Sequence, residues 1–217
     1  IYIHFPFCKS RCNYCDFNTS VGYENCIPDY CASLVKEIKI TARECQQEYI
    51  IPTIYLGGGT PSYLMADCIE KILQAIGDSF QEAPEVEITL EANPADITFE
   101  KWKCWQAAGI NRLSIGMQSA QDEELKMLGR RHHFADVEKA VEILKCANME
   151  NFNLDLMFGL PYQNLLTWQD SIQKALGLYP SHLSLYALTL TEASPLAKDI
   201  QAGIYPPPDD DLAADMY

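Results

Sequence analysis

Six short strand-like runs recur along the chain with helical stretches between them, and this alternation restricts the fold more than any other feature. The runs cover 1–7, 53–59, 86–94, 111–119, 151–161 and 182–190. Helical patterns include 28–47 and 134–147, and helix starts are expected at Pro28, Asp67, Thr98 and Thr167. Alternating strands and helices indicate βα units on a parallel sheet, either doubly wound or barrel-like.

Several of these runs have one apolar and one polar face. In VEITLEA, positions 86, 88 and 90 are apolar, whereas Glu87, Thr89 and Glu91 share the other face. Parallel strands covered by helices on both faces read instead as continuous apolar runs. A polar inner face suits a barrel lumen, so we predict an α/β fold, a partial (βα)6 TIM-like barrel.

Polar residues also gather where strands end, which is where such barrels build their sites. The residues in question are Gly58, Glu91, Gln118 and Asp155. Alternatively, some of these side chains only satisfy one another inside the lumen.

Composition excludes some classes of partner and compartment. The net charge of −14, from 30 acidic and 16 basic residues, disfavours nucleic-acid binding. The sequence has no apolar run long enough to span a bilayer and no recognisable signal peptide. Nine cysteines, an odd number, fit a reducing compartment, which we take to be the cytoplasm or an organelle matrix.

The composition of the sequence changes after Leu190. The segment YPPPDDD at 205–211 is followed by LAADMY, which reads as the beginning of a helix. We therefore predict a barrel over 1–190 and the start of a truncated C-terminal extension over 191–217.

Cys8, Cys12 and Cys15 lie within eight residues, directly after the first strand-like run. Three thiolates on one loop can hold a [4Fe–4S] cluster and leave one iron open. The amino and carboxylate groups of S-adenosylmethionine can chelate that iron, and an electron from the cluster then cleaves the sulfonium to start radical chemistry. Two alternatives are a zinc site completed by His4 and a redox pair made by Cys12 and Cys15. The other six cysteines are expected to be buried small hydrophobes.

The segment YIHFPFCKSRCNYCDFN at 2–18 resembles the signature of the oxygen-independent coproporphyrinogen III oxidase family. GGGTPS at 57–62, EANP at 91–94, NRLSIGMQS at 111–119, LGRRH at 128–132, NLDLMFGLP at 153–161 and LSLYALT at 183–189 follow in the family order. The resemblance covers essentially the whole chain and implies a radical S-adenosylmethionine protein with a partial α/β barrel.

The resemblance also implies roles for individual residues. It makes Cys8, Cys12 and Cys15 the cluster ligands and assigns no other catalytic residue. The implied S-adenosylmethionine contacts are Tyr2, Tyr14, Gly58, Gly59, Thr60 and Glu91, with Gln118, Arg130 and Asp155 reaching a second S-adenosylmethionine or the substrate. Without the family pattern, the glycines would read as a tight turn and Arg130 as a solvated cation at a helix end. His132 and His133 are expected to be surface or packing residues.

One departure bears on function. The oxidase has a fourth cysteine two positions after the third, where this chain has Phe17. CDFN resembles an oxidase-like sister group that binds haem and delivers it to other proteins. We therefore expect a haem chaperone in the cytoplasm. Its expected partners are haem or a porphyrin, an electron donor such as flavodoxin or ferredoxin, and a haem-accepting protein. The alternative is an enzyme of the coproporphyrinogen dehydrogenase type, which decarboxylates two propionates.

Overall fold

The computed structural model describes residues 1–45 and 49–217. Its strands are β1 (Tyr2–Phe5), β2 (Ile50–Gly58), β3 (Gln81–Ala92), β4 (Arg112–Gln118), β5 (Phe152–Phe158) and β6 (His182–Ala187). Its α-helices are α1 (Ile27–Glu44), α2 (Ala66–Gly77), α3 (Phe99–Ala107), α4 (Asp122–Met127), α5 (Phe134–Cys146), α6 (Leu165–Gly177), α7 (Pro195–Gln201) and α8 (Asp210–Met216). Short 3-10 turns lie at Glu24–Cys26, Pro61–Tyr63 and Pro94–Asp96.

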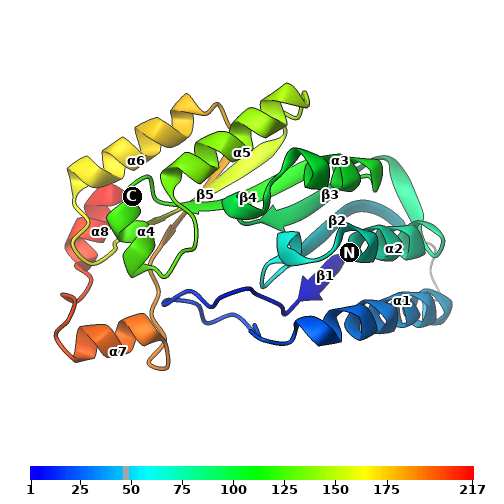
Figure 1. Cartoon of the computed structure of the whole chain (residues 1–217), viewed down its shortest axis with the longest axis horizontal. Helices are drawn as coiled ribbons and strands as arrows, with labels where there is room; N and C mark the ends of the chain where they lie inside the picture. The colour runs from blue at the N-terminus through cyan, green and yellow to red at the C-terminus, as the bar shows by residue number, and fades with distance from the viewer. Residues whose placement is uncertain (46–48) are drawn as a thin grey trace. The chain divides into compact units, whose positions relative to one another are not determined.

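All six predicted strands are present, and they form one sheet in the order β1-β2-β3-β4-β5-β6 (Figure 1). The strand pairs β1–β2, β2–β3 and β5–β6 are parallel, with Tyr2 opposite Tyr55 and Leu56 opposite Leu90. Strands β1 and β6 are the two ends of this order. The prediction of βα units on a parallel sheet is therefore confirmed.

The predicted helix starts are correct only in part. Thr98 caps α3, because its hydroxyl accepts a hydrogen bond from the Lys101 backbone N–H at 3.2 Å. Thr167 is not the cap of α6. That position belongs to Asn164, whose side chain accepts from the backbone N–H groups of residues 166 and 167. An asparagine in extended conformation caps better than a threonine three residues inside the helix.

The other helix predictions shift by one residue or fall outside the described chain. Helix α2 begins at Ala66 after Met65, so Asp67 lies inside the first turn and is not the cap. Pro28 stands in the first turn of α1, where its missing N–H costs nothing. The predicted helix over 28–47 ends at Glu44, and its positions 46 and 47 lie outside the described residues.

The chain divides into two compact units. Unit 1 comprises Ile1–Lys9, Asn18–Ala92 and Asp96–Leu113, and unit 2 comprises Ser10–Phe17, Asn93–Ala95 and Ser114–Tyr217. The predicted boundary between 190 and 191 stays a prediction.

Unit 1 buries the apolar faces of its strands beneath amphipathic helices. Phe5, Leu56 and Leu90 are completely buried. Helix α2 supplies isoleucines at positions 69, 72 and 76, which recur at helical spacing and are also fully buried. These contacts hold the strand ends in place, where the polar residues project.

Unit 2 has a core of its own. Met127, Leu128, Met157, Leu160 and Leu196 form a buried cluster. The C-terminal residues 191–217 pack in this unit, since the Trp168 indole N–H donates to the Met216 carbonyl at 2.9 Å.

The cysteines outside the 8–15 motif do not all behave as expected. Cys31 and Cys68 are buried, but Cys26, Cys45, Cys104 and Cys146 are exposed, so the prediction of six buried cysteines is wrong for four of them. Three of these four lie at helix ends or in the Glu24–Cys26 turn, where side chains face outward. None of the nine cysteines, all of which the structure describes, is in a disulfide.

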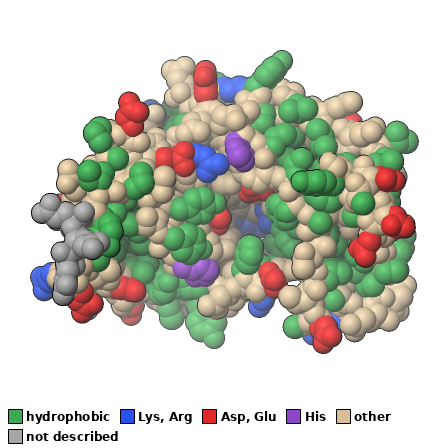
Figure 2. Space-filling model, turned by 180° about the vertical axis from the view of Figure 1, so that it is seen from behind, with side chains coloured by type: hydrophobic (Ala, Val, Ile, Leu, Met, Phe, Trp, Pro, Cys, Tyr) green, Lys and Arg blue, Asp and Glu red, His purple; other side chains and the backbone are tan. Residues whose placement is uncertain are grey.

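The distribution of charged side chains on the surface is consistent with the negative net charge. On the face drawn in Figure 2, acidic side chains are spread widely and the Lys and Arg side chains are scattered. Within the described residues, no helix is long and apolar enough to cross a membrane.

Candidate functional site

The cysteine motif lies on a loop that is closed at its base. Within unit 1, the Cys8 N–H donates to the Ser20 carbonyl at 3.0 Å, and the Ser20 N–H donates to the Pro6 carbonyl at 2.6 Å. Cys8 belongs to unit 1, whereas Cys12 and Cys15 belong to unit 2. Among the described residues, no three His, Cys, Asp or Glu side chains are grouped closely enough to hold a metal ion. The fit of a cluster is therefore judged from the surroundings of each cysteine.

In unit 1, Glu91 is held at the end of β3 with a fixed orientation. Its Oε1 accepts a hydrogen bond from the Tyr55 hydroxyl at 2.8 Å, and its Oε2 accepts from the Gly58 N–H at 3.0 Å. The two strands carrying these groups are neighbours in the sheet. Sequence reasoning found Glu91 and Gly58 but missed Tyr55, although Tyr55 shares the polar face of its strand.

At Gly58, the last residue of β2, and at Gly59, a side chain would collide with neighbouring atoms. A Cβ at position 59 would lie 2.8 Å from the Phe7 carbonyl oxygen and 2.9 Å from the Cys8 Sγ. Gly58 has φ +113°, and a Cβ there would meet the His4 ring at 2.7 Å. Beside them, the Thr60 hydroxyl donates to the Cys8 Sγ at 3.4 Å. This close backbone approach to a thiol requires glycine.

The contacts between Tyr2 and His4 test the alternative of a zinc site completed by His4. The His4 Nδ1 lies 3.0 Å from the Tyr2 hydroxyl, and its Nε2 lies 3.0 Å from the Asn18 carbonyl oxygen. Because a carbonyl can only accept, Nε2 carries the proton and Nδ1 accepts from Tyr2. Both ring nitrogens are thus engaged, which argues against His4 as a metal ligand. Partial burial and the charge of Glu91 raise the pKa of Tyr2.

In unit 2, Arg130 links the cysteine loop to strand β4. Its Nη1 donates to the Cys12 Sγ at 3.4 Å, and its Nη2 donates to the Gly116 carbonyl at 2.8 Å. Removal from water alone would lower the pKa of Arg130, but Tyr14 and Cys12 raise it above its ordinary value. The interpretation of Arg130 as a solvated helix-end cation is therefore wrong, because its guanidinium is bound to protein groups.

Asn13 fixes the middle of the same loop. Its backbone N–H donates to the Leu128 carbonyl at 2.9 Å, and its Nδ2 donates to the Met127 carbonyl at 2.8 Å. Its own carbonyl accepts from the Leu196 N–H at 2.9 Å. A Cβ at Gly129 would strike the Asn13 side chain at 2.9 Å. The loop segment between Cys12 and Cys15 is thus anchored on three sides.

Asp155 stands in a network of short polar side chains along the strands of unit 2. Its Oδ1 accepts from the Asn153 Nδ2 at 2.6 Å, and its Oδ2 accepts from the Ser114 hydroxyl at 3.2 Å. The Ser184 hydroxyl donates to the Asn153 Oδ1 at 3.1 Å. Strand alternation indicated that Asn153 and Asp155 share a face, but the partners on β4 and β6 could not be paired from sequence.

Gln118 ends β4 with φ +66°, an uncommon conformation for a residue other than glycine. The Tyr186 hydroxyl donates a hydrogen bond to its Oε1. Strained residues that the surrounding structure holds in place are typical of ligand sites. Tyr186 was missed at the sequence level, although it lies in the LSLYALT segment.

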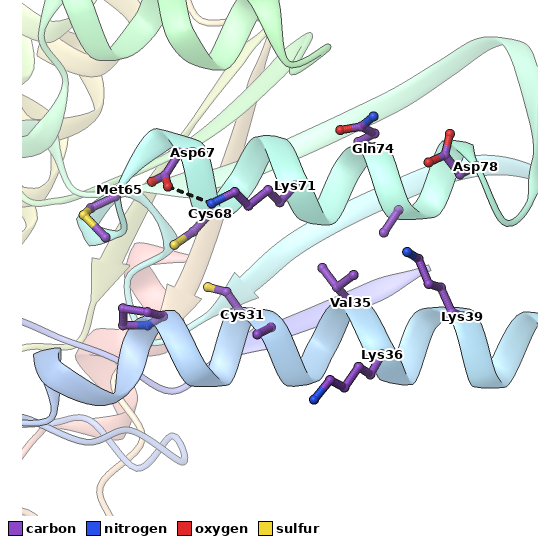
Figure 3. A pocket seen from close by; sticks show the side chains of 13 residues that line it. Cys31, Val35, Lys36, Lys39, Met65, Asp67, Cys68, Lys71, Gln74 and Asp78 are labelled. Carbon is purple, nitrogen blue, oxygen red and sulfur yellow. Dashed lines mark hydrogen bonds and ion pairs between the residues drawn. The ribbon is translucent and has the colours of Figure 1, made fainter.

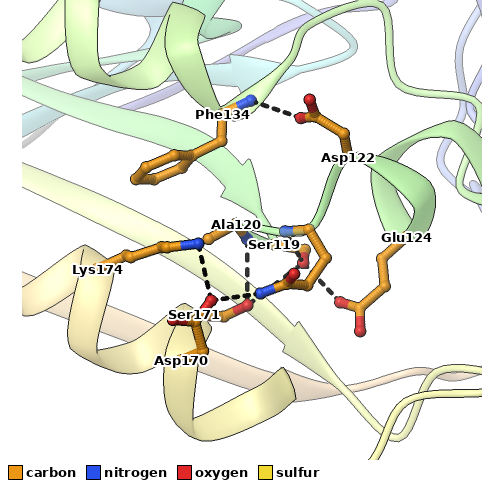
Figure 4. Close-up of polar contacts among 9 residues, drawn as sticks. Ser119, Ala120, Asp122, Glu124, Phe134, Asp170, Ser171 and Lys174 are labelled. Atoms are coloured by element: carbon orange, nitrogen blue, oxygen red, sulfur yellow. Dashed lines mark hydrogen bonds and ion pairs between the residues drawn. The ribbon is translucent and has the colours of Figure 1, made fainter. Parts of the chain in front are cut away.

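The residue after Gln118 is fixed by a buried network, shown in Figure 4. The Ser119 hydroxyl donates to the Glu124 carboxylate at 2.5 Å, and the Ala120 N–H donates to the Ser171 hydroxyl at 3.2 Å. Burial raises the pKa of Glu124, although hydrogen bonds from Ser119 and Gln163 oppose that shift. The network explains how the chain can hold Gln118 in its strained conformation.

The two adjacent histidines have different surroundings. His132 is buried, and its Nε2 lies 3.1 Å from the Met117 carbonyl. His133 is 71% exposed, with its Nδ1 3.3 Å from Asp122. The prediction of surface or packing residues is confirmed for both.

A parallel α/β sheet with a cysteine loop after its first strand and a glycine-lined end on its second describes a radical-type iron–sulfur protein. A sequence model of the Radical SAM superfamily matches residues 2–175. The chain therefore belongs to the radical S-adenosylmethionine superfamily.

Several relatives match along the whole chain. The heme chaperone HemW of Haemophilus influenzae is 38% identical over 224 residues, which cover 100% of this chain and 57% of that protein. The mouse radical S-adenosyl methionine domain-containing protein 1, mitochondrial, is 37% identical over 219 residues, covering 100% of this chain and 49% of its own. The chain spans about half the length of these curated relatives.

Solved structures agree on the fold. Coproporphyrinogen III oxidase (HemN) from Escherichia coli superposes with a TM-score of 0.88 over 99% of this chain and 49% of its own, at 24% identity. Elp3 from Methanocaldococcus infernus superposes with a TM-score of 0.66 over 87% of this chain and 48% of its own, at 18% identity. The predicted fold class is thereby confirmed.

Membership of the superfamily implies a [4Fe–4S] cluster and S-adenosylmethionine, and the surroundings of Cys8, Cys12 and Glu91 suit these groups. Cys8 and Cys12 each accept a hydrogen bond from a neighbouring side chain, which stabilises sulfur that carries negative charge. The glycine-lined strand end beside Glu91 offers backbone polar groups and a carboxylate to a ligand ammonium.

Proposed function

We propose that Cys8, Cys12 and Cys15 hold the [4Fe–4S] cluster. This proposal is supported by the spacing of the three cysteines, the closed base of their loop and the hydrogen bonds to Cys8 and Cys12. When bound, a cluster of this kind supplies one electron to S-adenosylmethionine. The chain's own part is to position the thiolates and leave one iron open to the ligand.

The proposed S-adenosylmethionine contacts fall into two groups, one in each unit. Unit 1 carries Tyr2, Gly58, Gly59, Thr60 and Glu91, whereas unit 2 carries Tyr14, Gln118, Arg130 and Asp155. Glu91 and the glycines suit an ammonium or ribose hydroxyls. Arg130 and Gln118 suit a carboxylate or an amide-like edge.

Metal analysis tests the cluster proposal. Protein reconstituted anaerobically should hold about four irons, as a [4Fe–4S] cluster requires. The Cys12→Ala and Cys15→Ala variants should lose the brown absorbance, whereas the exposed Cys104→Ala control should keep it. Zinc in place of iron after anaerobic preparation, or a cluster that persists in Cys12→Ala, would contradict the proposal.

For the protein as a whole, we propose that it binds haem and transfers it to other proteins. The observation that carries this proposal is Phe17. The oxidase pattern has a cysteine at this position of the loop, whereas here the phenylalanine is 64% exposed. An exposed aromatic ring offers apolar surface and stacking to a flat ligand but no thiol chemistry. The relatives that carry the name heme chaperone support the same function.

A pair of assays tests this function against the alternative. Full-length protein carrying its cluster should give a saturable Soret shift with haem. It should release no carbon dioxide from labelled coproporphyrinogen III when reductant and S-adenosylmethionine are supplied. Robust decarboxylation would overturn the chaperone proposal and make the protein an oxidase. An electron donor such as flavodoxin or ferredoxin, and a haem-accepting protein, complete the proposed set of partners.

The cytoplasm is the proposed compartment. The fit of the cysteine chemistry to a reducing environment supports it. The mouse relative is named mitochondrial, and a mitochondrial matrix would satisfy the same chemical requirement.

A further inference from the structure

Helices α1 and α2 of unit 1 enclose a groove with a volume of about 510 Å³. Two cysteines line it, Cys31 from α1 and Cys68 from α2, and Figure 3 shows their sulfur atoms directed toward each other across the groove. Lysines 36 and 39 on α1 and Lys71 on α2 also line it. Neither cysteine belongs to the proposed cluster site.

The two thiols form a contact pair. Each residue is only 4% exposed, and their sulfur atoms are directed toward each other from facing helices (Figure 3). Burial, followed by the neighbouring Cys68 thiol, raises the pKa of Cys31 to about 12, while the nearby Lys71 cation acts in the opposite direction. Lys71 is fixed by an ion pair with Asp67 at 3.1 Å. The pair therefore combines close thiols, an open groove and a neighbouring cation.

We propose that Cys31 and Cys68 are a thiol-modification site, at which hydrogen peroxide converts the pair into a disulfide that links α1 to α2. The Cys68 thiolate attacks the peroxide O–O bond, becomes a sulfenic acid and releases one water after proton uptake. The Cys31 thiol then displaces the second water and forms the S–S bond. Overall, two thiols and one peroxide give one disulfide and two waters.

The placement of the thiols explains the pairing and the order of the two steps. Cys68 lies one turn from Lys71 on α2, whereas Cys31 lies on the facing helix α1, so we place the first attack at Cys68 and the second, resolving step at Cys31. Peroxide is small enough to enter a groove of this volume. The exposed cysteines at 26, 45, 104 and 146 face solvent and do not line the groove. Residues 31 and 68 are the two buried thiols outside the cysteine loop, within the described chain.

Peptide mapping after oxidation tests the site. The full-length protein is treated with hydrogen peroxide, its remaining thiols are alkylated and the digest is analysed by mass spectrometry. We expect a peptide pair joined through Cys31 and Cys68 that separates again with dithiothreitol. Recovery of both residues in the alkylated state, while exposed cysteines are oxidised, would overturn the proposal. This readout distinguishes a disulfide between Cys31 and Cys68 from any disulfide among Cys8, Cys12 and Cys15.

Variants test the order of the steps. In Cys31→Ala, dimedone should trap a sulfenic acid at Cys68, because the resolving thiol is missing. In Cys68→Ala, Cys31 should remain unmodified at the same peroxide dose. Cys104→Ala, which removes an exposed cysteine on α3, should leave the cross-link yield within about twofold of the wild type. Equal oxidation of Cys31 in the absence of Cys68 would show that the two thiols react independently and would overturn the pair.

Discussion

Arg130 and His132 are two residues apart, yet one side chain is charged and the other is neutral. Arg130 donates to a thiol and a carbonyl, so its permanent charge is compensated by protein groups. His132 is buried close to that charge, and its imidazole has to stay neutral. The LGRRH segment therefore places one fixed cation and one neutral ring under the end of β4, a division that the residue types alone do not reveal.

Protonation of His132 should make the stability of the folded protein depend on pH. Burial and the Arg130 charge lower the pKa of His132 from 6.5 to about 4. The unfolded chain takes up a proton at this residue below pH 6.5, whereas the folded protein does so only near pH 4. Stability should therefore fall as the pH drops from about 6.5 to 4, by about 3 kcal/mol from this residue.

Urea unfolding between pH 4 and 7 checks this expectation. His132→Asn should lose most of the pH slope, whereas His133→Gln, which changes the exposed neighbour, should keep it. An unchanged slope in His132→Asn would show that carboxylates alone account for the acid sensitivity.

A Glu91→Gln variant distinguishes a role of Glu91 in ligand binding from a role in packing. In Glu91→Gln the remaining carbonyl oxygen can still accept one of the hydrogen bonds from Tyr55 and Gly58, so the fold and the cluster should survive. Losing the carboxylate charge should weaken S-adenosylmethionine binding about tenfold, since charged hydrogen bonds contribute about 1.5–3 kcal/mol.

Calorimetric titration under argon measures that affinity. Glu87→Gln is the matched control, because Glu87 projects from the same strand four residues earlier and is exposed. Equal affinities in all three proteins would assign Glu91 to the structure of the strand end.

At the scale of elements, sequence reasoning placed every strand but not every helix start. Strand alternation depends on nearest neighbours in the chain, and that information is local. The start of α6 depends on which of two nearby polar residues adopts extended backbone, and Asn164 does so with φ −138°. The partners of Asn153 and Asp155 on β4 and β6 are set by register across the sheet, which a single sequence does not contain.

The loop that carries Cys12 and Cys15 should depend on its anchor at Asn13. The Asn13→Ala variant loses the 2.8 Å hydrogen bond to the Met127 carbonyl but keeps both backbone bonds. One hydrogen bond contributes about 1 kcal/mol, so the reconstituted cluster should release iron to a chelator about fivefold faster.

Lys9→Ala is the control, because Lys9 is an exposed residue of the same loop. The rate is measured from the decay of cluster absorbance with excess chelator under argon. Identical rates in Asn13→Ala and the wild type would show that the backbone bonds alone hold the loop.

At the scale of the whole molecule, the cysteine spacing and the family motifs predicted the class of protein, because they are contiguous in sequence. Tyr55 and Tyr186 were missed, because their roles arise only when separate strands meet. The exposed cysteines were missed because a helical residue's direction depends on what the helix packs against. What could be predicted is local pattern, and what could not is the pairing of distant residues.

The net charge of −14 of this chain leads to a prediction about the proposed binding of haem. Haem carries two propionates, so the long-range field of an acidic protein should slow its approach. Raising the salt concentration from about 20 mM to about 200 mM shortens the screening length from roughly 20 Å to below 10 Å and should speed haem association by roughly threefold. Stopped-flow absorbance at the Soret band measures the rate.

Haem dimethyl ester, whose propionates are neutral, should associate at a rate that salt does not change. A haem rate that falls with salt would mean that a local cationic site near the entrance outweighs the net field of the protein, contrary to the scattered Lys and Arg side chains seen on the face in Figure 2.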